Sequence, residues 1–308
     1  MIDFLSSYEV LIQLTLSMTL LAISLQIPLR MGVISFASVG YFAIGGYATA
    51  ILVAQQGINA WAAVFLSTIL GGVIAYILGL GIAHLNGLYL AMATVSFSLI
   101  LSVVAVNGGS LTGGPVGLFG VIGPITTWHF LVVVAVVIFL VSFTERGKLS
   151  RRFDAIREDP QLAAAMGINV VRYRRLSFLI SGAIGALSGS MATLMKSAIS
   201  PESIGFGLII LALTVIIVGG QGSWVGAVLG SLFFLWMPQT IKFVGTWEPV
   251  LYGFIVAVAA VTLPGGVLAV YRNWRYRRTA AKVIAQQEAR TRDLAMSGAT
   301  GGGSGDGV

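Results

Sequence analysis

Charge and cysteine are what this sequence has least of. Eighteen Lys/Arg and eleven Asp/Glu residues make up only 9% of the 308 residues, whereas soluble domains carry about a quarter charged residues. So few charges do not cover the surface of a water-soluble fold that is 57% apolar. The absence of cysteine excludes disulfides, thiolate metal sites and cysteine nucleophiles, and two histidines, His84 and His129, are too few for a His-rich metal site. With a mean hydropathy of +0.94, most of the chain is expected to have lipid as its solvent.

Acidic residues and catalytic motifs are missing from the apolar segments. Glu9 stands at the end of one segment, and no Asp or Glu lies deep in any of them. Proton- or sodium-coupled transporters usually bury such carboxylates, which argues against a secondary transporter, although backbone carbonyls also bind sodium. No H-E-x-x-H, G-x-S-x-G or G-x-x-x-x-G-K-[ST] motif occurs. We therefore expect no catalytic residue, metal or cofactor on this chain, and any ATP that drives it to bind another polypeptide.

Long apolar segments run through the chain. A hydrocarbon core of about 30 Å needs roughly 20 helical residues, and nine segments meet or approach that length. They predict an all-α polytopic membrane protein with about nine transmembrane helices, eight and ten being the alternatives. Only residues 219–222 separate the seventh and eighth segments, which predicts a tight hairpin or a partly re-entrant pair. The expected spans are residues 9–29, 33–54, 60–83, 87–106, 125–143, 176–195, 201–219, 222–242 and 249–271.

Lysine and arginine predict the orientation. Eight of the 18 lie in residues 145–175 and seven more follow residue 271, and such clusters mark cytoplasmic segments. Four expected spans separate the two clusters, so both fit on one side. Counting back places the N-terminus outside and Arg30 inside, and only Lys196 and Lys242 are then external. The net charge of +7 thus reflects membrane topology, and no nucleic-acid partner is expected.

The chain divides into a transmembrane domain, residues 1–271 with a cytoplasmic loop at 145–175, and a basic cytoplasmic tail, residues 272–308. The first apolar stretch lacks a basic n-region and is expected to be a retained helix. Residues 272–278 (RNWRYRR) are typical of an interfacial anchor. The Gly/Ser-rich end, residues 298–308, is expected to be disordered.

Small residues recur at a four-residue spacing in several spans. In lipid, helices associate through close van der Waals contact between such residues, so these stripes predict helix–helix seams. The stripes are Gly71/Ala75/Gly79, Gly185/Gly189 and Gly222/Gly226/Gly230. Residues 35–47 differ because they combine small, hydroxyl and aromatic side chains, a composition expected for a helix that lines a narrow path or breaks near the membrane midplane.

The cytoplasmic loop carries helix-capping signals. A helix is expected to stop near Glu158, where Asp159 is a good N-cap and Pro160 suits the first position of a second helix. Residues 161–166 are long enough for about two turns, and Gly167 is placed to end them in a left-handed conformation. The loop is therefore structured, either as a docking element or as a solvated segment whose charges only maintain topology.

Several blocks, in order, resemble the permeases of branched-chain amino acid ABC importers, in particular the LivM branch of that family. Together they extend from about residue 30 to 265. They are residues 32–47 (GVISFASVGYFAIGGY), 87–94 (GLYLAMAT), 111–118 (LTGGPVGL), 155–159 (AIRED), 165–169 (AMGIN), 200–203 (SPES) and 218–226 (VGGQGSWVG).

The resemblance implies a permease subunit of an importer in a bacterial or archaeal cytoplasmic membrane. Its partners would be two ATPase subunits that bind ATP and Mg²⁺, a second related permease, an extracytoplasmic solute-binding protein and the lipid bilayer. The loop would be the coupling helix that follows the ATPases during alternating access. The residues expected to couple to the ATPase are Arg157, Glu158, Asp159, Leu162, Ala165, Met166 and Gly167.

Two further sets of residues follow from the resemblance. For the first set, the path candidates, interhelical hydrogen bonding is the alternative, because small hydroxyls in membrane helices also serve that purpose. For the second set, the external docking candidates, the alternative is a purely interfacial role. The path candidates are Ser35, Ser38, Tyr41, Tyr47, Thr94, Ser96 and Ser98. The candidates for docking the binding protein are Thr112, Lys196 and Glu202.

Departures from the family pattern concern the solute. Residues 37–38 (AS), Asn86 and residues 263–266 (LPGG) stand where relatives commonly carry Gly-His, arginine and Arg-Pro-x-Gly. The solute is therefore open between branched-chain amino acids and other small polar solutes such as urea, amides and small acids. A secondary transporter or channel, and an accessory membrane protein, are the alternative functions.

Overall fold

The computed structural model describes residues 8–82, 84–85, 87–145, 147–241 and 253. Apart from residue 253, the expected ninth span (249–271) and the tail (272–308) with its basic anchor lie outside the described residues, as do Asn86, Arg146 and Lys242.

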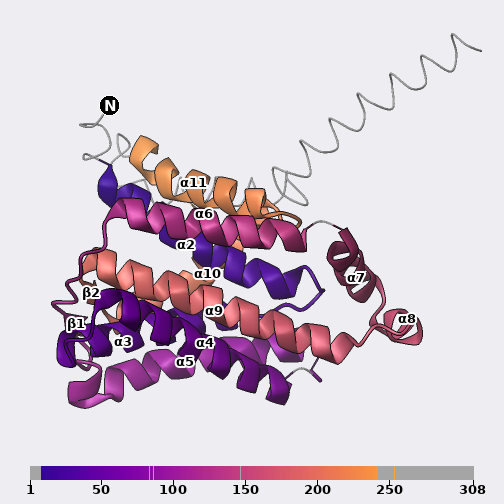
Figure 1. The fold of residues 1–308 in the computed structure, drawn as a ribbon, viewed down its shortest axis with the longest axis horizontal. Coiled ribbons are helices and arrows are strands. Elements are labelled where there is room, and N and C mark those ends of the chain that lie inside the picture. The colour runs from indigo at the N-terminus through magenta and orange to yellow at the C-terminus, as the bar shows by residue number, and fades with distance from the viewer. Residues whose placement is uncertain (1–7, 83, 86, 146, 242–252, 254–308) are drawn as a thin grey trace, which may run out of the picture.

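Helices make up most of the described structure (Figure 1). The two strands are two residues long and pair with each other antiparallel. The elements are α2 (Glu9–Leu29), α3 (Ala37–Ala50), the π-helical η1 (Ile51–Gln55), α4 (Ala60–Ile82), α5 (Gly87–Asn107), the 3₁₀ turn η2 (Gly109–Leu111), β1 (Leu118–Phe119), α6 (Thr127–Thr144), α7 (Gly147–Glu158), α8 (Pro160–Ala165), α9 (Val170–Lys196), β2 (Ala198–Ile199), η3 (Pro201–Ile204), α10 (Phe206–Gly219) and α11 (Trp224–Ile241).

Six helical segments of the described chain are long and apolar enough to cross a membrane, namely α2, α3 with η1, α4, α5, α6 and α9. Helices α10 and α11 pass the same test only as a pair, with a bend of 118° between them. The prediction of an all-α polytopic protein is therefore confirmed. The total of nine spans stays a prediction.

The starts of α9 and α10 differ most from the expected ones. Helix α9 begins at residue 170, six residues before the apolar stretch, because Asn169 caps it there. Its first two turns therefore carry the arginines Arg172, Arg174 and Arg175. Helix α10 begins at residue 206, because the preceding proline opens a separate 3₁₀ turn.

Helix α9 is the centre of the bundle. It packs most extensively against α4, α3 and α2, and 72% of its apolar window is buried, against 22% for α6 and 28% for α5. In Figure 1 it runs through the middle of the molecule with α6 on one side and α5 on the other. The helices with the most buried surface thus form an inner layer, and α5 and α6 are peripheral.

Glycines form the seams of this inner layer. A Cβ added at Gly189 would overlap the backbone of Phe42 in α3, and one at Gly182 would overlap Ala75 in α4. Gly226 likewise packs against Gly219 across the α10–α11 turn. The predicted seams are confirmed except at Gly222, which lies in that turn with no atom within 4 Å of an added Cβ; for Gly222 the prediction was wrong, because the helix starts only at Trp224.

The two ends of the bundle carry different structures. The β1–β2 pair lies at one end, and α7 and α8 project at the other (Figure 1). The α10–α11 turn contacts the C-terminal part of α2, where Gln26 Nε2 donates to Gln221 O. Near the other end of α2, Trp236 Nε1 donates to Thr15 Oγ1. Helix α11 therefore returns along α2, as a hairpin would.

Candidate functional site

Helix α8 is a short, firmly capped turn. The carboxylate of Asp159 accepts hydrogen bonds from the backbone N–H groups of Gln161 (2.8 Å) and Leu162 (3.0 Å). At the other end Gly167 is left-handed, with φ +82°. Its N–H and that of Ile168 donate back to Ala164 and Ala163, which is the Schellman arrangement. The predicted N-cap and glycine stop are confirmed.

An apolar cluster attaches α7 and α8 to the bundle. Phe153 and Ile156 of α7 and Ala163 of α8 are buried together with Phe178 of α9 and Leu90 of α5. The start of the α2–α3 connection joins the same cluster through Met31 and Val33. Packed side chains therefore connect α7 and α8 to α5, to α9 and to the α2–α3 connection.

The outward surface of α8 is apolar. Leu162 is 59% and Met166 73% exposed, and Ala165 lies exposed beside them. Arg157, Glu158 and Asp159 are exposed at the preceding corner. The structure thus brings all seven predicted coupling residues together at one end of the molecule.

A buried ion pair, which the sequence did not indicate, connects the ends of α2 and α6 at this end of the bundle. Arg30 Nη1 lies 3.8 Å from Glu145 Oε1, with only 9% and 13% of the two side chains exposed. The Glu145 carboxylate also accepts from the backbone N–H of Trp224 (2.7 Å) and from Ser223 Oγ (2.9 Å). It therefore caps the start of α11, where a helix N-terminus favours negative charge.

The guanidinium of Arg30 contacts the coupling region as well. It lies 5.9 Å from the ring centroid of Phe153 in α7 and hydrogen-bonds to Thr144. Burial lowers the pKa of Arg30, an effect that the carboxylates of Glu145 and Asp154 partly offset. In the sequence, a lone arginine after the first span and a glutamate at the end of the fifth were the available signals.

We expect Glu145→Ala to lower the free energy of unfolding by about 3 kcal/mol, because removing one partner of a buried pair leaves the other charge uncompensated. Steric trapping in bicelles measures this, and a double-mutant cycle with Arg30→Met isolates the pair. Glu158→Ala, at an exposed carboxylate on the same end, is the control and should change stability by less than about 0.5 kcal/mol. Equal effects of the two substitutions would show that the ion pair contributes nothing.

The predicted path residues lie mainly between helices. Thr94 Oγ1 accepts from Phe36 N (3.0 Å), and Ser98 Oγ accepts from Gly40 N (3.1 Å) and donates to Phe36 O. These α5 hydroxyls thus bind the first turn of α3. Ser38 Oγ lies 3.3 Å from Ser181 Oγ in α9. In these positions the hydroxyls connect helices, which agrees with the interhelical hydrogen bonding that the sequence left open as an alternative to a path.

The other path candidates differ in their surroundings. Ser35 is buried and accepts weakly from Ala37 N, whereas Ser96 is exposed. Tyr41 and Tyr47 are buried on α3, and neither hydroxyl has a hydrogen-bond partner within the described part of the chain. A buried hydroxyl without a partner is costly, and these two are the described side-chain groups of α3 whose hydrogen-bonding capacity is unmet.

The opposite end joins two segments distant in sequence. Leu118 pairs with Ile199 and Phe119 with Ala198, which places residues 111–118 beside residues 196–203. Thr112 is buried, whereas Lys196 and Glu202 are exposed, so two of the three predicted docking residues have exposed side chains. Among the described residues, no three His, Asp or Glu side chains are grouped closely enough to hold a metal.

Apolar spans, seams of small residues and a projecting capped turn together define a multi-pass membrane protein. The chain belongs to the family described as branched-chain amino acid transport system / permease component, whose sequence model matches residues 8–261. It is a multi-pass protein of the cytoplasmic membrane.

The chain is similar to several curated permeases. It is 24% identical over 267 residues to the high-affinity branched-chain amino acid transport system permease protein LivM of Salmonella typhimurium. That match covers 76% of this chain and 63% of the relative. LivM of Escherichia coli is 24% identical over 295 residues, covering 84% and 69%. The probable permease LivH of Methanocaldococcus jannaschii is 26% identical over 243 residues, covering 72% and 74%. No solved structure matches the chain.

Proposed function

We propose that the chain is the membrane-spanning permease subunit of an ATP-binding-cassette importer. Its solute is a branched-chain amino acid, as the names of its relatives say of those proteins, or a related small polar solute such as urea, an amide or a small acid. Two ATPase subunits hold ATP and Mg²⁺, while this chain has no catalytic role and binds no cofactor. A second related permease and an extracytoplasmic binding protein complete the assembly.

The observation that carries this proposal is the shape of the α7–α8 corner. A short helix fixed at both ends by caps exposes Leu162 and Met166 while Phe153 and Ile156 remain buried in the bundle. Exposed apolar side chains on a rigid element indicate a docking surface for another protein. We infer that an ATPase groove covers α8 and that its movement shifts the balance between outward-open and inward-open states.

The remaining predictions are consistent with this scheme. Nine crossings, with the N-terminus outside and the tail inside, put α8 in the cytoplasm and the β1–β2 end outside. There Thr112, Lys196 and Glu202 are proposed to meet the binding protein. The path is proposed to follow α3 and α5, with Tyr41 and Tyr47 as the leading contacts for solute, because their buried hydroxyls lack partners within the described residues.

The test removes the α8 cap without changing its exposed face. Asp159→Ala costs a capping bond of about 1 kcal/mol, so we expect solute-stimulated ATP hydrolysis by the purified assembly to fall about fivefold. Asp159→Asn is the matched control, because asparagine caps a helix as well as aspartate does, and it should retain the stimulation of the parent. If both variants couple normally, α8 is not the coupling element. Solute uptake driven by an ion gradient in vesicles holding this chain without ATPases would instead support a secondary transporter.

A further inference from the structure

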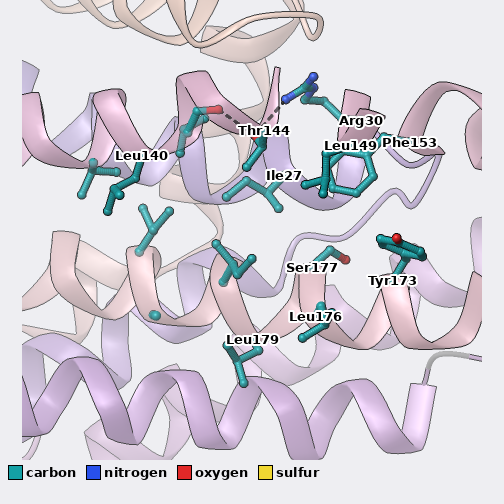
Figure 2. A pocket seen from close by; sticks show the side chains of 15 residues that line it. Ile27, Arg30, Leu140, Thr144, Leu149, Phe153, Tyr173, Leu176, Ser177 and Leu179 are labelled. Carbon is teal, nitrogen blue, oxygen red and sulfur yellow. Dashed lines mark hydrogen bonds between the residues drawn. The ribbon is translucent and has the colours of Figure 1, made fainter. Parts of the chain in front are cut away.

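An apolar cavity of about 430 Å³ lies between α6 and α9, closed at the back by α2 and at one end by α7. Figure 2 shows Leu140 and Thr144 on one side of it and Leu176 and Leu179 on the other. This volume lies within the range of small-molecule sites, about 300–1,000 Å³. The cavity belongs neither to the α8 docking face nor to the proposed solute path along α3 and α5.

Residues with polar groups line the otherwise apolar cavity at one end only. Arg30, Thr144, Tyr173 and Ser177 line the end next to α7. The walls beyond them are aliphatic, formed by Val137, Leu140, Val141, Ile180, Ala183 and Ile184. A ligand that matches this lining is an amphiphile with a long hydrocarbon part and a polar head at the α7 end.

The lining residues also show where the cavity opens. Leu140 is 59% and Ile180 38% exposed, and both lie within helices that are long and apolar enough to span the bilayer. The mouth is therefore at the side of the bundle, where the surrounding medium is lipid. An empty apolar void loses dispersion contacts along its whole wall and is too apolar to hold ordered water, so a flexible acyl chain is the occupant at hand.

Cationic side chains surround the polar end. Arg152 of α7 hydrogen-bonds to the hydroxyl of Tyr173, a lining residue, and lies 5.9 Å from its ring centroid. Arg172 precedes the lining residue Leu176 by four positions on α9, one turn along the same face. Both arginines are exposed. Basic residues at the cytoplasmic side of a pocket between spans favour an anionic lipid headgroup.

We propose that this cavity binds one acyl chain of an anionic phospholipid, with its headgroup phosphate held by Arg152 and Arg172. The assignment to the cytoplasmic leaflet rests on the proposed orientation; the site itself does not. Because Leu149 and Phe153 of α7 form part of the wall, a bound lipid packs directly against the helix that leads into α8. Anionic lipid thereby stabilises the attachment of the coupling element.

The site can be tested by photo-crosslinking in nanodiscs. The full chain, alone and in its assembly, is placed in phosphatidylcholine containing a minor fraction of phosphatidylglycerol with a diazirine on its acyl chain, and labelled peptides are mapped by mass spectrometry. We expect labelling of α6 and α9 at the cavity wall, competed by unlabelled phosphatidylglycerol and not by phosphatidylcholine. Ile180→Trp, which fills the cavity, should reduce this labelling at least about tenfold, a change of about 1.4 kcal/mol.

Matched variants separate the acyl and headgroup contributions. Val132→Trp places the same ring on the exposed outer face of α6, away from the cavity, and should leave labelling unchanged. Arg152→Gln with Arg172→Gln should reduce the advantage of phosphatidylglycerol about tenfold, whereas Arg151→Gln, two positions from both Leu149 and Phe153, should retain it.

Two outcomes would overturn the proposal. Labelling spread evenly over exposed faces and insensitive to Ile180→Trp would indicate bulk lipid only. Labelling of the wall that disappears on assembly with the second permease would show that a protein covers the cavity. Neither readout requires transport or ATP hydrolysis, so failure here is distinct from failure of the proposed function.

Discussion

Replacing Leu162 and Met166 together by arginine is expected to reduce solute-stimulated ATP hydrolysis of the assembled importer at least about tenfold, the equivalent of 1.4 kcal/mol or more of lost coupling. The two side chains are the large apolar groups that α8 exposes, at 59% and 73%. Against an apolar groove, two guanidinium groups would have to be desolvated without partners, which is strongly unfavourable. The α8 fold itself should persist, because its caps are Asp159 and Gly167.

Val171→Arg is the matched control for this double variant. Val171 is 47% exposed and lies at the same end of the bundle, in the first turn of α9 and outside α8. It should leave stimulation within about twofold of the parent, as expected for a surface change away from an interface. Stimulation that survives Leu162→Arg with Met166→Arg would show that the ATPase docks elsewhere.

Gly189→Leu should be the most destabilising single substitution in the inner layer, lowering the free energy of unfolding by more than about 4 kcal/mol, the range of severe overpacking. Even a Cβ at this position would overlap the carbonyl of Phe42 and approach the backbone N of Gly46 within 3.0 Å. The obstructing atoms are backbone, so α3 and α9 would have to separate. Steric trapping and the fraction of monodisperse protein in detergent measure the loss.

Gly81→Leu provides the contrast within the same fold. Gly81 is in α4, is exposed, and has no atom within 4 Å of an added Cβ. Leucine also has a better helix propensity than glycine by about 0.5–1 kcal/mol, so this variant should match or exceed the parent in stability. If Gly189→Leu and Gly81→Leu behave alike, the seam is not close-packed in the membrane.

The α7–α8 corner shows how far local signals reach. Asp159, Pro160 and Gly167 predicted the start and end of α8 correctly, because capping depends on side-chain and backbone groups within a few residues. The same local logic explains why the expected spans 9–29, 60–83 and 87–106 agree closely with α2, α4 and α5. Whether the exposed face of α8 meets an ATPase stays a prediction.

The ion pair and the cavity were beyond such reasoning. Arg30 and Glu145 are more than a hundred residues apart, and nothing near either residue indicates its partner. The Thr94 and Ser98 hydroxyls likewise fitted both a path and, more often, an interhelical bond by type alone. Only the packing of α5 on α3 shows that they bind the first turn of α3.

Composition and short-range pattern determined on their own that this chain is a polytopic helical membrane protein with a capped helical turn and glycine seams. Lipid requires apolar helices about 20 residues long, and the length and composition of each segment show by themselves whether it meets that requirement. The tertiary structure decided that α9 is central, that Glu145 holds the start of α11 beside Arg30, and that α6 stands off α9 around a cavity. Those features depend on which helix faces pack together. Such contacts join segments that are distant in the sequence, and the local sequence of one segment does not indicate its partner.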